Sequence, residues 1–127
     1  MSSFRLKKHS VKEASFVENT EKEKKKNMEV GLEGGILIPK DYDKNRHVAI
    51  KLKFHLGKEE ERLYLTLETL STFEEEDRRV DASEEVVQRD CLPIALANLR
   101  KTLREVTKAY GLPALDLPPF DEEDIEV

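Results

Sequence analysis

The chain contains very few of the residues that form disulfides, metal clusters and large aromatic cores. Its 127 residues include one cysteine, no tryptophan, three tyrosines and five phenylalanines. The single thiol, Cys91, excludes an internal disulfide and has no second thiol with which to build a metal cluster. This composition is typical of a protein from a reducing cytosol, so we expect the chain to be cytoplasmic.

Long apolar stretches are also missing. The first 19 residues contain no apolar core of a signal peptide, and no stretch approaches the roughly 18 apolar residues that a membrane-spanning helix needs. The sequence therefore predicts neither secretion nor membrane insertion.

Basic charge is too sparse for a typical nucleic-acid-binding protein. The formal net charge is -5 and the isoelectric point is near 5.3. Binding to phosphates requires net positive charge or a concentrated basic face. The one basic run, at residues 22–26, is diluted by Glu21 and Glu23. Nucleic acid is therefore not an expected partner.

The length fits one compact domain over residues 1–127 and is too short for two domains of ordinary size. Charged residues make up 39% of the chain and hydrophobic residues 38%, which predicts a thin core beneath a crowded polar surface. A thin core favours a subunit that buries further apolar surface in an assembly. We therefore expect a homo-oligomer.

Apolar residues at every second position predict strands within residues 1–80. The most regular alternation spans residues 48–56, and a similar one follows over residues 63–73. An earlier strand over residues 28–38 is interrupted by Gly34 and Gly35. Because short turns separate these strands, neighbours are expected to be antiparallel.

The first predicted strand, over residues 4–16, alternates less regularly than the others. Its apolar pattern slips once near His9 and Ser10, which predicts a bulge, because one extra residue inverts the face of every later side chain. Each strand has one apolar and one mostly polar face. The sheet should therefore be covered on one side and open to water on the other.

The apolar spacing changes to a helical period in the segment 83–111. Ser83 is a candidate N-cap followed by acidic residues, and Pro93 suits the first turn of a new helix, so we expect a short helical turn and then the main helix. Gly111 is a plausible C-cap, with Pro113 just beyond it. The predicted fold is α+β, a four-stranded antiparallel sheet with one long amphipathic helix packed on it.

The last segment, residues 112–127, cannot be regular helix throughout, because three prolines interrupt it. Its first part has alternating apolar residues and its end is acidic. We expect an extended apolar tail, with room for no more than a short second helix.

The residues around this helix exit carry a resemblance to a known family. The segment Gly111, Leu112-Pro113, Leu115, Leu117 and Pro119 is similar to the helix exit of SecB, the tetrameric chaperone that holds exported proteins unfolded. The family's exit has a Gly-rich turn, a Pro, two leucines at alternate positions and a second Pro. The first strand's ending at residues 12–16, and Phe73 at the close of the fourth strand, also resemble the family.

The resemblance implies a dimer of dimers that binds unfolded polypeptides without a cofactor, and it implies SecA as a possible partner. The family's acidic contacts with SecA match only partly, at Glu13 and Glu18, because Val17 replaces a carboxylate and Thr66 stands at another acidic position. The family's long second helix and basic tail have no counterpart after Pro119. Docking to SecA is therefore less strongly implied than client binding.

Catalytic and metal-binding groups do not converge in the sequence. Cys91 with His47 or His55 could imitate a thiol and its base, but no orienting partner stands at a motif spacing. Cys91 begins an apolar stretch, where a buried structural cysteine is common. His9, His47 and His55 lack the spacings of metal-binding motifs. We expect no enzyme, no metal and no cofactor.

The remaining candidate chemistry is exposed apolar surface. A holding chaperone needs shallow hydrophobic grooves, rimmed by charge, that accept extended segments. The predicted client-binding residues lie near one sheet edge and in the tail, namely Ile36, Leu37, Ile38, Tyr42, Leu112, Leu115, Leu117, Phe120 and Ile125. For Leu115 and Leu117 the alternative interpretation is a lid that closes the core.

Three functions stay open from the sequence. The first is an ATP-independent holdase for protein export or general folding. The second is a SecB-like chaperone dedicated to the antitoxin of a toxin–antitoxin system. The third is a scaffold subunit with the same fold that holds no clients.

Overall fold

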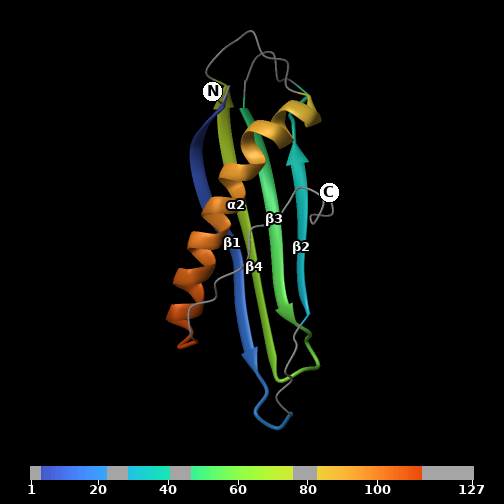
Figure 1. The fold of residues 1–127 in the computed structure, drawn as a ribbon, viewed down its shortest axis with the longest axis vertical. Coiled ribbons are helices and arrows are strands. Elements are labelled where there is room, and N and C mark those ends of the chain that lie inside the picture. Colours follow the sequence, from blue (N-terminus) through green and yellow to red (C-terminus); the bar gives the residue numbers. More distant parts are fainter. Residues whose placement is uncertain (1–3, 23–28, 41–46, 76–82, 113–127) are drawn as a thin grey trace.

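The architecture is one antiparallel sheet with a helix lying obliquely across one of its faces (Figure 1). The computed structural model describes residues 4–22, 29–40, 47–75 and 83–112. The strand order is β1-β4-β3-β2, so the chain crosses from one edge of the sheet to the other between β1 and β2. The elements are β1 (Phe4–Glu18), β2 (Val30–Leu37), β3 (His47–Gly57), β4 (Leu63–Glu75) and α2 (Glu84–Ala109). The predicted sheet and helix are confirmed.

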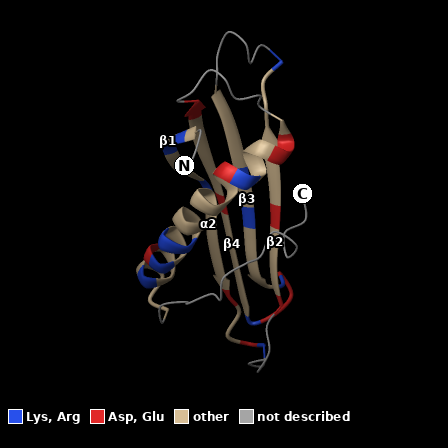
Figure 2. Ribbon diagram, turned by 45° about the horizontal axis from the view of Figure 1, so that its top comes forward, with Lys and Arg blue, Asp and Glu red and all other residues tan. Residues whose placement is uncertain are grey.

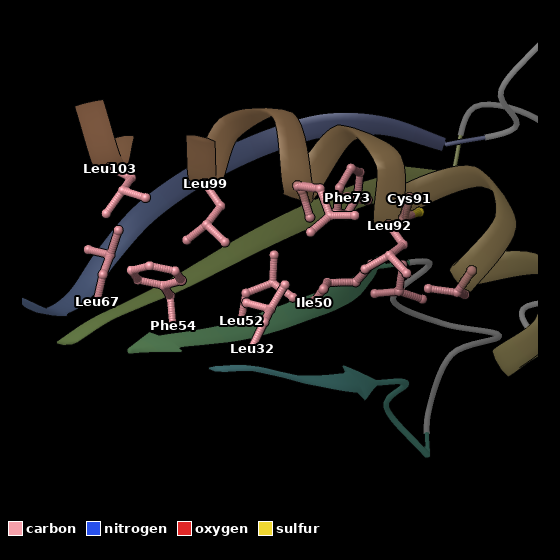
Figure 3. Packing of buried hydrophobic residues seen from close by; sticks show 14 of the residues in the cluster. Leu32, Ile50, Leu52, Phe54, Leu67, Phe73, Cys91, Leu92, Leu99 and Leu103 are labelled. Carbon is pink, nitrogen blue, oxygen red and sulfur yellow. The ribbon is translucent and has the colours of Figure 1, made fainter. Parts of the chain in front are cut away.

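The core lies between the sheet and α2, and the alternation in β3 shows how it is built. Val48, Ile50, Leu52 and Phe54 are buried beneath the helix, while the residues between them point to the other face. Leu99 and Leu103 of α2 meet these strands from above (Figure 3). Because only one face is covered, the expectation of a sheet with one open face is confirmed for the described residues.

β1 has two bulges where the sequence predicted one. Its pairing with β4 shifts between Leu6 and Lys8 and again between Val11 and Glu13, which leaves Lys7 and Lys12 as the extra residues. A single slip would have put Val11 on one face and the apolar residues beyond it on the other. The second bulge restores the original alternation, so Ala14 and Phe16 return to the helix-covered side.

The helix is continuous, and the predicted break before Pro93 is wrong. Ser83 is the N-cap, as expected, and its side chain accepts a hydrogen bond from the backbone N–H of Val86 at 3.2 Å. Pro93 lies inside α2 at an exposed position, where water can hydrogen-bond to the carbonyl that the missing N–H leaves. Buried Leu92 and Leu96 hold the helix on the core on both sides of it.

The helix ends where the sequence predicts. Tyr110 is the C-cap, and Gly111 follows with a φ of 79°, a left-handed conformation that glycine adopts without strain. The N–H of Leu112 then donates to the carbonyl of Thr107 at 2.9 Å, which folds the chain back against the last turn. The predictions for residues 113–127 lie outside the described residues.

Candidate functional site

A shallow apolar hollow lies at one corner of the sheet, where β2 ends before β3 does. The pairing of β2 with β3 stops at Leu37 and Ala49, whereas β3 continues to pair with β4 as far as His47. The two extra residues of β3, His47 and Val48, therefore extend past the last paired residue of β2. The chain leaves the strand at Ile38 and Pro39, and the hollow forms beside this exit.

The lining of this corner hollow is almost entirely apolar. Its volume is about 470 Å³, and its walls come from the end of β2, the start of β3 and one residue of β4, namely Ile36, Leu37, Ile38, Pro39, His47, Val48, Ala49 and Thr72. Leu37 is 52% exposed, which is the largest exposure among the large hydrophobic residues of the described chain. An exposed leucine at the rim of an apolar hollow is suited to contacts with another apolar chain.

The structure brings together three of the predicted client-binding residues and separates a fourth. Ile36, Leu37 and Ile38 all line the corner hollow, and the two isoleucines also pack against the core. Leu112 packs against the core at the other end of α2. The remaining predicted residues, Tyr42, Leu115, Leu117, Phe120 and Ile125, lie outside the described residues.

Sequence reasoning missed the half of the hollow that β3 and β4 contribute. His47, Ala49 and Thr72 face away from the helix and line the hollow with Leu37. Ala49 is the register partner of both Leu37 and Thr72. The pattern of β3 indicated its polar face, but only the pairing shows that this strand extends past β2.

The neighbourhood of the hollow on the open face is polar and partly basic. Lys7 reaches across β4, and its Nζ lies 3.1 Å from Nε2 of His47. An ammonium group only donates, so this nitrogen of His47 is the acceptor in the contact. Beside it, Arg5 donates to Glu74 at 3.0 Å, and this bond and the charge of Lys7 lower the pKa of the Glu74 carboxyl.

A second hollow on the same strand has the opposite chemistry. It has a volume of about 320 Å³ and lies on the open face, lined by Glu33, Gly34, Gly35, Lys51, Lys53 and Glu68. Lys51 and Glu68 form an ion pair at 3.0 Å within it. Charged and glycine residues make this hollow a poor apolar contact, so β2 has a polar middle and an apolar end.

The structure does not bring the two predicted acidic docking residues onto one face. Glu13 pairs with Glu68 and faces the open side of the sheet. Glu18 follows Phe16 at a two-residue interval, on the helix-covered side, and lies 3.9 Å from Arg62. A single acidic face made of both carboxylates is therefore not present in the described part of the chain.

One pair of side chains has the spacing of a nucleophile and its base. Nδ1 of His9 lies 3.0 Å from Oγ of Ser71, and Nε2 lies 2.9 Å from Oγ1 of Thr102. The Thr102 hydroxyl donates to the carbonyl of Asn98 at 2.8 Å, so it must accept from Nε2–H of His9, and Nδ1 then accepts from Ser71. However, Ser71 is 0% exposed. No substrate reaches this hydroxyl, and the contact ties β1 to β4 and α2.

Cys91 has the properties of a structural cysteine. It is free, 0% exposed and part of the hydrophobic core. Burial, with a smaller contribution from the charge of Asp90, raises the pKa of its thiol to about 12. A thiol with such a pKa supplies almost no thiolate near neutral pH, and thiolate is the reactive form.

The described residues contain no group of three or more His, Cys, Asp or Glu side chains placed to hold a metal ion. In the same part of the chain, α2 is not apolar enough to cross a membrane.

Comparison with known proteins identifies the architecture. No family model matches the sequence, and no curated protein matches it either. Among solved structures, a SecB-like chaperone of Mycobacterium tuberculosis, in complex with a ChAD peptide from the HigA1 antitoxin, aligns with a TM-score of 0.68 and 13% identity. The alignment covers 94% of this chain and 88% of that one. This chain has a SecB-like fold.

The SecB-like fold confirms the structural part of the resemblance seen in the sequence. At 13% identity the likeness to the mycobacterial chaperone concerns the fold. A protein of unknown function from Streptococcus agalactiae also aligns, with a TM-score of 0.45 and 16% identity over 94% of this chain and 99% of that one.

Proposed function

We propose that this chain is an ATP-independent holdase chaperone that binds non-native polypeptides, and that the corner hollow at the end of β2 is one of its contact sites. The observation that supports this proposal is the exposed Leu37 beside an apolar hollow at a sheet edge. An extended polypeptide presents alternate side chains to such a surface without needing a defined sequence. A compact folded protein has already buried these side chains and binds poorly.

Each contact of this kind is weak, so holding depends on several contacts at once. Several subunits of a homo-oligomer, each with a corner hollow, gain affinity when they share one client chain. This mode of action requires no nucleotide and no chemistry, so we propose a cytoplasmic chaperone without enzymatic activity. The client leaves when a partner takes it or when it folds.

A pair of matched substitutions tests the role of the hollow. Leu37→Glu places a charge where an apolar client side chain would pack, and the affinity for an unfolded model protein should fall about tenfold or more, since burying a leucine contributes about 1.5–3 kcal/mol. The control is Val17→Glu, because Val17 is also on the open face and is 50% exposed, but lies on the other edge strand.

The measurement is the suppression of aggregation of a denatured client, together with its dissociation constant by fluorescence anisotropy. Both substituted positions are exposed, so both variants should unfold at the temperature of the parent. Equal loss of holding in the two variants, or in neither, argues against the corner hollow. A parent chain that suppresses no aggregation at stoichiometric amounts overturns the holdase itself and favours a scaffold role.

A second candidate is a chaperone dedicated to one antitoxin. The observation that favours it is the antitoxin peptide bound to the mycobacterial protein of the same fold. A dedicated chaperone should bind one antitoxin segment tightly and protect unrelated denatured proteins poorly. Titrating the chain with an antitoxin encoded beside its own gene, and with two unrelated clients, separates the two candidates. Delivery of clients to SecA stays a prediction.

A further inference from the structure

The chain's negative charge is concentrated in its last segment. Residues 113–127 contain six carboxylates, at positions 116, 121, 122, 123, 124 and 126, and no basic side chain. Because the whole chain has a net charge of -5, the preceding 112 residues have a net charge of about +1. The molecule is therefore a nearly neutral body joined to a strongly acidic tail.

The last two and a half turns of α2 have the opposite charge. Four basic residues at helical spacing form a line along this part of the helix, which we name the basic stripe and which consists of Arg100, Lys101, Arg104 and Lys108. Lys101, Arg104 and Lys108 are exposed, and Glu105 is the one acidic residue within this stretch. Blue segments gather at this end of the helix in Figure 2.

Helix stability alone does not account for the basic stripe. Cations in the last turn stabilise a helix through its dipole, and this explains Lys108. Arg100 and Lys101 precede the last turn, where the effect has faded. Within the described part of the chain, Lys101 and Lys108 take part in no ion pair. These two lysines are suited to binding carboxylates from outside the described residues.

The acidic run can reach this stripe easily. Asp121 follows Leu112 by nine residues, which span up to about 30 Å when extended. Arg104 precedes Leu112 by eight residues, a distance of only about 12 Å along a helix. The left-handed Gly111 and the Leu112–Thr107 hydrogen bond already turn the chain back toward the helix. A short tether also gives the tail a local concentration of about 1 mM, which favours a contact within the chain over one between chains.

We propose that the acidic segment 121–126 is an intramolecular ligand of the basic stripe on α2. An acidic polypeptide that competes for the stripe releases the tail, and so does salt, because these ion pairs are exposed. The proposal does not depend on whether the chain is a holdase.

The test is a paramagnetic relaxation measurement on the full chain. A nitroxide is attached to the variant Val127→Cys, and buried Cys91, with a pKa of about 12, should stay unlabelled. In about 50 mM salt the label should broaden the amide signals of residues 100–108, and in about 500 mM salt most of the broadening should disappear as screening increases. Persistent broadening in high salt, or broadening confined to other elements, overturns the proposal.

Charge variants show whether the stripe is responsible. Reversal of its three exposed members should abolish the broadening, in a variant that carries Lys101→Glu, Arg104→Glu and Lys108→Glu. The control reverses three exposed lysines of the sheet, with Lys8→Glu, Lys12→Glu and Lys53→Glu, and should retain it. Should the stripe variant fail to fold, neutralising the tail gives the same test without touching the helix, with Asp121→Asn, Glu122→Gln, Glu123→Gln and Asp124→Asn.

Isotope mixing distinguishes one chain from two. A sample that mixes spin-labelled chains without ¹⁵N and unlabelled chains with ¹⁵N reports only contacts between chains. No broadening in this mixture supports docking on the chain's own helix. Broadening as strong as in the uniformly prepared sample assigns the contact to a second copy and overturns the proposal.

Discussion

The two edges of the sheet differ in almost every property that governs pairing with another chain. β1 has 15 residues, two bulges and three lysines, Lys7, Lys8 and Lys12, that discourage a further strand. β2 has eight residues, one charged side chain, Glu33, and an unshifted register with its neighbour. An unbulged edge with little charge accepts an extended chain more readily than a bulged, basic one.

This difference indicates which edge of the sheet can pair with another polypeptide. Bulges and lysines on β1 prevent unwanted pairing along most of its length. On β2 the corresponding features are absent over the described strand, and the corner hollow adds an apolar contact at its end. The holdase function proposed above would use β2 as the permissive edge and β1 as the protected edge.

The largest effect on stability is expected at Gly31, where β2 packs closely against His55 of β3. A Cβ at Gly31 would overlap the imidazole ring of His55, a half-buried side chain that would have to turn away, so Gly31→Ala should lower the free energy of unfolding by about 1 kcal/mol. Urea denaturation followed by circular dichroism measures this change. His55→Ala in the same chain should recover most of the loss, because it removes the ring.

The control for this change lies on the same strand. A Cβ at Gly35 would have no heavy atom within 4 Å, so Gly35→Ala should alter stability by no more than about 0.5 kcal/mol. If Gly31→Ala is equally well tolerated, close packing of Gly31 against His55 does not contribute to holding β2 on β3.

A smaller effect should follow from giving β2 the charge that β1 has. Gly35→Lys places a long cation on the open face, two residues before Leu37. A Cβ at this position has no heavy atom within 4 Å. Client affinity should fall several-fold, since lysine on an edge opposes strand addition, while repulsion from Lys51, its cross-strand partner, should lower stability by no more than about 1 kcal/mol. Anisotropy titration and urea denaturation report the two quantities separately. Unchanged affinity would show that clients do not approach along this part of the edge.

Much of the fold could be predicted because strong periodicity fixed it. In β3 the apolar alternation is unbroken, and its buried residues are the expected ones. Pro93 misled the helix prediction, since packing of Leu92 and Leu96 outweighs the local cost of proline. The sequence predicted one bulge in β1 instead of two, because the alternation of apolar residues alone does not show which residues pair.

The site was only half predictable, for a geometric reason. Ile36, Leu37 and Ile38 are a compact apolar run whose position at a strand end is visible in the sequence. The contribution of His47 and Thr72 depends on the order β4-β3-β2 and on how far each strand extends. Pairing between distant segments follows from the whole core, which short-range patterns do not determine.

The smallest expected effect concerns the way β1 is held beneath the helix. His9 donates to Thr102 and accepts from Ser71, in a neutral form that suits its partly buried place. Burial lowers the pKa of His9, and the nearby charge of Glu105 opposes this only in part. When the pKa of a histidine is lower in the folded state, the unfolded chain takes up its proton first as the pH falls.

The direction in which stability changes with pH follows from this lowered pKa. Stability should be highest above the ordinary histidine pKa of about 6.5 and should fall as the pH drops from there through the lower pKa of folded His9. His9→Gln keeps a donor for Thr102 without titrating, so its stability curve should be flatter between about pH 7 and pH 5.5. Thermal unfolding across this range measures the parent and the variant, and a parent curve as flat as that of His9→Gln would show that His9 titrates alike in the folded and unfolded chains.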